Sequence, residues 1–118
     1  MNSFENENRF GIYDKSYRLM TEVFESFSEI ERVILYGSRA MGNYKKGSDI
    51  DLAIVGEAVN LHTVNKLSDK LNEEIPVPYY FDVLDYNALA NAQLKKHIDK
   101  EGKLLYSRSR SKHQAESG

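Results

Sequence analysis

Hydrophobic residues recur at spacings of three and four in two segments of the chain, which is the pattern of a helix with one buried face. The first segment runs from Asp14 to Ser28, and Asp14 is placed to cap its N-terminus. The second begins near residue 61 and ends before Pro76. We expect both helices to pack against one core. Their apolar positions are Tyr17, Met20, Val23, Phe24 and Phe27 in the first, and Leu61, Val64, Leu67 and Leu71 in the second.

Short runs rich in β-branched and aromatic residues predict strands between and after these helices. We expect strands at residues 32–36, 49–55 and 79–84, and a shorter last strand at 103–106. One or two short helices are expected between residues 89 and 98. This order predicts an α/β (α+β) fold, in which helices pack on one side of a small mixed β-sheet.

The length of 118 residues is that of one ordinary domain. Residues 1–10 are polar and acidic, and we expect a flexible N-terminus there. Residues 11–106 are expected to form the folded domain. Residues 107–118 lack large hydrophobic side chains, so the sequence predicts a disordered tail.

Composition narrows the classes of protein that the chain can belong to. No apolar run approaches the ~20 residues of a membrane span, and the N-terminus does not resemble a signal peptide. These features predict a cytoplasmic protein without a membrane partner. The net charge of −2 argues against a dedicated nucleic-acid binder. Cysteine is absent, so a metal would need oxygen or histidine ligands, and oxygen ligands favour Mg²⁺.

Two aspartates two positions apart in the second strand are the first candidate for chemistry. Side chains at positions i and i+2 of a strand project from the same face, so Asp49 and Asp51 should lie together. The alternate residues, Ile50, Leu52 and Ile54, then face the core. Carboxylates this close repel each other and raise each other's pKa unless a cation lies between them. An alternative is that both are edge-strand charges that only oppose aggregation.

Asp82 is a third carboxylate within an otherwise apolar strand. If that strand lies beside the second one, Asp82 joins Asp49 and Asp51 in a site for Mg²⁺, which phosphate oxygens and water would complete. The spacing does not decide between one ion and two. Asp82 can also be structural, and Asp85 competes with it but falls on the opposite strand face.

The segment that follows the first strand has the features of a phosphate-binding corner. Gly37 allows close approach of a ligand to the backbone, the Ser38 hydroxyl can bind phosphate, and Arg39 can add a charge-assisted hydrogen bond. Gly37 and Gly42 have the separation of a P-loop, but Asn43-Tyr44 stands where that motif needs Lys-Ser/Thr.

Other polar residues carry weaker signals. Lys45 and Lys46 either steer a triphosphate by their charge or belong to a plain solvated loop. His62, His97 and His113 are isolated in the sequence, and we assign none of them a catalytic role.

The stretch ILYGSRAMGNYKKGSDIDLAI resembles the signature of the polymerase-beta-like nucleotidyltransferase superfamily, particularly its minimal nucleotidyltransferase (MNT) branch. Ten residues separate Gly37-Ser38 from Asp49, and FDVLD at 81–85 supplies a third aspartate. The resemblance implies that Gly37 and Ser38 hold the triphosphate, that Asp49, Asp51 and Asp82 are catalytic and bind Mg²⁺, and that ATP is the substrate. Met41 departs from the family pattern, in which many relatives have a second Arg or similar polar residue.

The family resemblance also implies a partner. Stand-alone domains of this branch resemble antitoxins whose partner is a HEPN-type ribonuclease toxin, and the implied reaction is transfer of AMP from ATP to a tyrosine of that toxin. Two alternatives stay open at this point. One is an antitoxin that only binds its toxin, and the other is a small-molecule nucleotidyltransferase of the aminoglycoside type. A homo-oligomer or hetero-oligomer is compatible with each.

Overall fold

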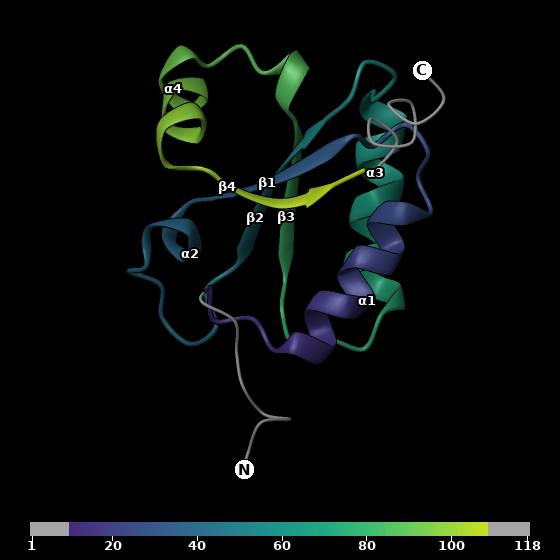
Figure 1. Ribbon diagram of the computed structural model, residues 1–118, viewed down its shortest axis with the longest axis vertical. Helices are drawn as coiled ribbons and strands as arrows, with labels where there is room; N and C mark the ends of the chain where they lie inside the picture. Colours follow the sequence, from purple (N-terminus) through teal and green to yellow (C-terminus); the bar gives the residue numbers. More distant parts are fainter. Residues whose placement is uncertain (1–9, 109–118) are drawn as a thin grey trace, which may run out of the picture.

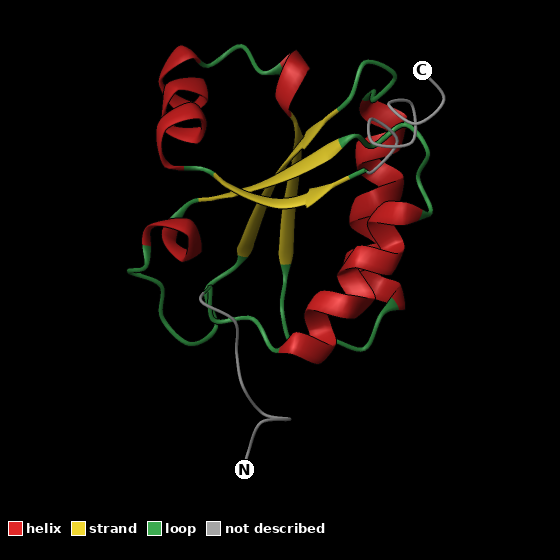
Figure 2. Ribbon diagram, viewed as in Figure 1, coloured by secondary structure: helices red, strands yellow, loops and turns green. Residues whose placement is uncertain are grey.

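The computed structural model describes residues 10–108, which form a four-stranded sheet with helices against both of its faces (Figures 1 and 2). This architecture confirms the predicted fold class. The elements in chain order are α1 (Asp14–Glu25), β1 (Arg32–Tyr36), α2 (Ser38–Met41), β2 (Ile50–Val55), α3 (Leu61–Asp69), the π-helix η2 (Lys70–Glu74), β3 (Phe81–Asp85), the 3₁₀-helix η3 (Tyr86–Ala88), α4 (Ala92–Glu101) and β4 (Lys103–Ser107).

The sheet is mixed, with the strand order β3-β2-β1-β4. Strand β1 is antiparallel to both β2 and β4, whereas β2 and β3 are parallel. Parallel neighbours need a crossover connection, and α3 with η2 provides it. The register places Asp51 of β2 beside Tyr36 of β1 and beside Asp82 of β3.

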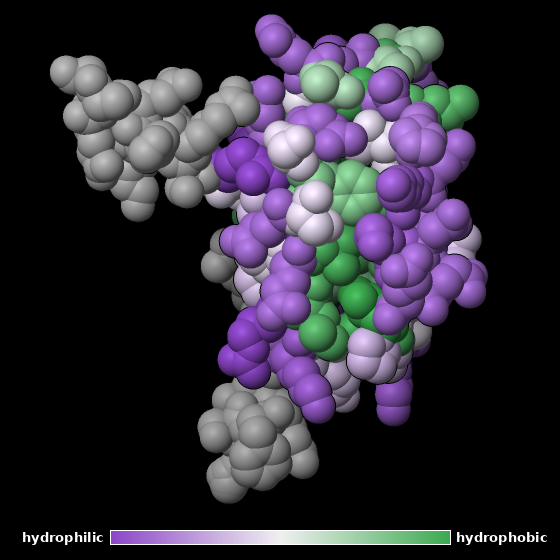
Figure 3. All heavy atoms as spheres, turned by 90° about the vertical axis from the view of Figure 1, so that its right-hand side faces the viewer, coloured by the Kyte–Doolittle hydropathy of each residue, from purple (hydrophilic) through white to green (hydrophobic). Residues whose placement is uncertain are grey.

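One face of the sheet is covered by α1 and α3 and carries the main core. Ile50, Leu52 and Ile54 are fully buried there, as the alternation in the sequence predicts. Phe24 of α1 and Leu67 of α3 pack into the same cluster. Figure 3 shows the outside of this helical layer, which is mostly hydrophilic with a strip of hydrophobic side chains along its middle.

The opposite face is covered in part by α4 and by the segment from η3 that leads into it. Ile98 of α4 packs with Tyr36 and Ala53 in a second, smaller cluster. The sequence predicted that the helices pack on one side of the sheet. In the structure α1 and α3 share one face, whereas α4 lies on the other (Figure 1). Asp51 projects from this same face, next to Tyr36 in the register.

Several boundaries differ from the expectation. Asp14 begins α1 without capping it, and α1 ends at Glu25 rather than at Ser28. The folded part also extends beyond residue 106, because the Arg108 guanidinium donates to the carbonyls of Phe27 and Ile30. The other residues of the predicted flexible N-terminus and tail, 1–9 and 109–118, lie outside the described residues. Within residues 10–108, no helix has the length and apolar character that crossing a membrane requires.

Candidate active site

Three aspartates meet where β2 and β3 begin. Asp51 and Asp82 are directly paired on neighbouring parallel strands, and Asp49 immediately precedes β2. Asp51 is half-buried, whereas Asp49 and Asp82 are exposed. Asp85 pairs instead with Ile54, further along β3, where its carboxylate accepts a hydrogen bond from the Asn87 amide. The register therefore brings Asp82, and not Asp85, beside Asp51.

The electrostatics of this cluster follow from like charges at a partly desolvated position. Burial, and then the carboxylates of Asp82 and Asp49, together raise the pKa of Asp51 to about 6. Burial, Asp51 and Asp82 likewise raise the pKa of the Tyr36 hydroxyl. Both raised pKa values mean that this site disfavours additional negative charge. A cation bound here would stabilise the ionised carboxylates.

Gly37 fixes the corner that lies against Asp51. Its backbone has φ 79° and ψ −156°, a conformation that is almost restricted to glycine. A Cβ atom at this position would lie 3.3 Å from Cγ of Asp51 and would collide with its Oδ2. The corner and the carboxylate are therefore in direct contact, with Ser38 following as the first residue of α2.

His97 joins this site from α4, which the sequence did not indicate. The Gly37 amide donates to Nε2 of His97 at 3.4 Å, and the imidazole meets the Tyr36 ring edge-on at a centroid distance of 6.3 Å. Sixty positions separate Gly37 from His97, and only the packing of α4 brings them together. A weak indication that Tyr36 lies at the site was present in the sequence, since Tyr36 ends β1 immediately before Gly37.

The hydrogen bonds of Arg39 go to backbone carbonyls. Its side chain is almost fully buried, and its guanidinium donates to the carbonyls of Phe10, Gly11 and Ser48. The structure therefore gives no support to the predicted phosphate contact of Arg39. The side chain ties the start of the folded chain to the loop between α2 and β2, and its donors are directed at these carbonyls.

The donor set suits a hard divalent cation. Asp49, Asp51 and Asp82 supply oxygen atoms only, which Mg²⁺ prefers. Within residues 10–108, no group of three or more His, Asp or Glu side chains is close enough, as they lie, to hold a metal ion together. Binding by all three aspartates would therefore require side-chain rotation. The exposure of Asp49 and Asp82 leaves room for that rotation.

A mixed sheet with a Gly-Ser corner at one strand end and aspartates on the two following strands defines a nucleotidyltransferase. Residues 19–111 match the family Polymerase beta, Nucleotidyltransferase, and the chain belongs to this family. The match confirms the resemblance found in the sequence.

Individual relatives narrow the comparison. The chain is 35% identical to MJ0604 of Methanocaldococcus jannaschii, provisionally named a protein adenylyltransferase, over 65% of this chain and 79% of that protein. The fold is similar to that in a crystal structure of a toxin–antitoxin complex with AMP-PNP, with a TM-score of 0.64, 19% identity, and coverage of 83% and 78%. It is also similar to that in a complex of a tri-AMPylated Shewanella oneidensis HEPN toxin with an MNT antitoxin, with a TM-score of 0.60, 17% identity, and coverage of 85% and 76%.

Proposed function

We propose that this protein transfers AMP from ATP to a tyrosine hydroxyl of a HEPN-type ribonuclease toxin, and thereby acts as its antitoxin. The observation that carries the proposal is the position of Asp51, held between Asp82 and Asp49 and against the Gly37 corner. The name of the M. jannaschii relative and the toxin–antitoxin complexes with the same fold support this class of reaction and partner.

The reaction is a displacement at the α-phosphorus of ATP. The oxygen of the acceptor hydroxyl forms a bond to the α-phosphorus, and the bond from that phosphorus to the oxygen bridging to the β-phosphorus breaks. Pyrophosphate leaves with the electron pair of that bond. The exposed carboxylate of Asp82 would take the proton of the acceptor hydroxyl.

The remaining residues position the nucleotide and balance its charge. Gly37 and Ser38 form the corner against which the triphosphate lies, and His97 is close enough to the Gly37 amide to contact the same phosphates. Mg²⁺ held by Asp49, Asp51 and Asp82 would neutralise the triphosphate and stabilise charge that develops on the leaving oxygen.

The exposure of the site suits a macromolecular acceptor. Helix α4 covers part of this face, while Asp49 and Asp82 are exposed. A hydroxyl carried on the surface of another protein can therefore approach the aspartates without the chain opening.

The test is to incubate the purified chain with its HEPN toxin, ATP and Mg²⁺ and to measure the intact mass of the toxin. We expect an increase by one or more AMP groups, lost with EDTA and lost in the Asp51→Asn and Asp82→Asn variants. Asp85→Asn is the matched control, because it removes a carboxylate of the same strand while an asparagine can still cap η3. If the Asp51→Asn variant leaves the toxin unmodified and still blocks its ribonuclease activity, the chain acts by binding alone.

A further inference from the structure

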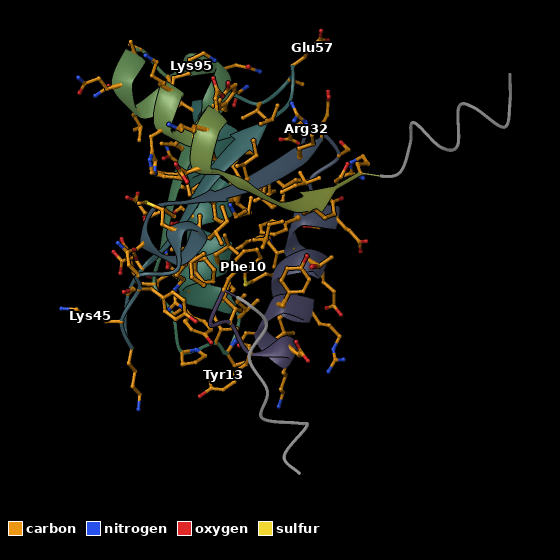
Figure 4. The ribbon with its side chains drawn as sticks, turned by 60° about the vertical axis from the view of Figure 1, so that its left-hand side comes forward. Phe10, Tyr13, Arg32, Lys45, Glu57 and Lys95 are labelled. Atoms are coloured by element: carbon orange, nitrogen blue, oxygen red, sulfur yellow. The ribbon has the colours of Figure 1, made fainter. Side chains whose placement is uncertain are left out.

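A cavity of about 440 Å³ lies beside the loop between α2 and β2 and shares no lining residue with the proposed active site. This volume is within the range of small-molecule sites, about 300–1,000 Å³. Figure 4 shows Tyr13 and Lys45 at the end of the molecule where the cavity lies, with Lys95 at the opposite end. The lining residues are Gly11, Tyr13, Arg39, Tyr44, Lys45, Lys46, Gly47, Pro78 and Tyr79.

Among residues 10–108, the charged side chains that line this cavity are all positively charged. They are Arg39, Lys45 and Lys46, and no aspartate or glutamate of the described residues lines the cavity. The Arg39 side chain is only 3% exposed, and within the described part of the chain no carboxylate lies within ion-pair distance of it. Carbonyl oxygens satisfy its hydrogen bonds without neutralising its charge. A buried cation without a counter-ion favours binding of an anion nearby.

The walls of the cavity are aromatic and closely packed. The Tyr44 and Tyr79 rings each lie 5.1 Å from the Arg39 guanidinium carbon, measured to the ring centroid. The Tyr79 ring is also 6.3 Å from that of Tyr13. A side chain at Gly11 would collide with the Tyr44 ring, so the backbone there holds that ring in place. Tyrosine rings are surfaces on which nucleobases stack.

We propose that this cavity is a second nucleotide-binding site, which takes a nucleoside monophosphate with its base against the tyrosines and its phosphate at Lys45 and Lys46. Two lysines match the two negative charges of a monophosphate, and phosphate is a good acceptor for charge-assisted hydrogen bonds. The loop also joins this cavity to the catalytic strand, because Arg39 binds the carbonyl of Ser48, the residue before Asp49. The site goes beyond the transfer reaction and does not depend on it.

The experiment measures binding of AMP to the full chain in EDTA, which removes divalent cations from the aspartates. We expect AMP to bind, and adenosine and ribose 5-phosphate each to bind at least tenfold more weakly, because each lacks one of the two recognised groups. The Lys45→Ala/Lys46→Ala double variant should weaken AMP binding by about tenfold or more. Both lysines are exposed, so the fold should be retained.

Two control variants locate the effect. Lys95→Ala/Lys96→Ala removes an adjacent pair of lysines from α4, at the other end of the molecule, and should leave AMP binding unchanged. Asp51→Asn should also leave it unchanged, so that a failure of this proposal is distinct from a failure of AMP transfer. No binding of AMP, equal binding by the Lys45→Ala/Lys46→Ala variant, or loss of binding in Asp51→Asn would each overturn the proposal.

Discussion

Replacing Gly37 with alanine tests the contact between the corner and the aspartate most directly. The φ of 79° with ψ −156° costs a non-glycine residue roughly 1–3 kcal/mol. The new Cβ would also lie 3.3 Å from Cγ of Asp51 and collide with its Oδ2, which displaces that carboxylate at a cost of about 0.5–1.5 kcal/mol. Alanine restricts the unfolded chain and recovers about 0.4–1 kcal/mol. The expected net loss of stability is roughly 2 kcal/mol, within a range of about 0.5–4 kcal/mol.

Gly42→Ala is the matched control for this variant. Gly42 has φ 86°, but a Cβ atom there would meet nothing within 4 Å, so only the cost of the backbone conformation applies. We expect a loss of about 1 kcal/mol or less. For a folded part of this size, 1 kcal/mol corresponds to a shift in Tm of about 4–8 °C, so thermal unfolding resolves the two variants.

A double variant separates the collision from the backbone strain. In an Asp51→Ala background the colliding oxygen is gone, and the nearest remaining atom, Cβ of residue 51, is at an ordinary 3.5 Å. Gly37→Ala should therefore cost about 1 kcal/mol less in that background than in the wild type. AMP transfer should be lost in Gly37→Ala and retained in Gly42→Ala. Equal costs in both backgrounds, or full transfer by Gly37→Ala, would refute the proposed geometry.

Substitutions at Asp51, His97 and Arg39 test the site and its surroundings. The pKa of Asp51 is raised to about 6 from an ordinary 3.8, so the folded state favours the protonated carboxyl. The stability that this group contributes is complete below pH 3.8 and is lost as the pH rises to 6. In urea titrations with EDTA, the wild type should therefore unfold more easily than Asp51→Asn above pH 6, and the difference should close toward pH 4. His97→Ala should raise the KM for ATP about threefold to tenfold with a smaller effect on kcat. His97→Gln should recover part of the lost affinity for ATP. Unchanged kinetics in His97→Ala would show that His97 does not contact the phosphates. Arg39→Lys should lower stability by about 2–4 kcal/mol in denaturant unfolding, because one ammonium cannot satisfy the carbonyls of both Phe10 and Ser48. AMP transfer per folded molecule should be retained. A selective rise in the KM for ATP would instead indicate that Arg39 binds phosphate.

Local periodicity in the sequence determined which face of β2 packs into the main core and which carries Asp51. A strand repeats every two residues, so the spacing of Asp49 and Asp51 sends both to one face and Ile50, Leu52 and Ile54 to the other. The burial of those three hydrophobic residues confirms this. The sequence motif was likewise sufficient for the family, because it lies within one stretch of the chain.

Tertiary structure decided what depends on contacts between distant segments. The choice of Asp82 over Asp85 depends on the register of β3 against β2, and a shift of one residue would exchange the two faces. The same holds for His97, which α4 brings to the corner from 60 positions away. The partners of Arg39 also lie in separate segments, so its residue type suggested phosphate binding while packing directed it to backbone carbonyls. Spacing along the chain carries no information about such pairings, since they arise only when helices and strands are packed together.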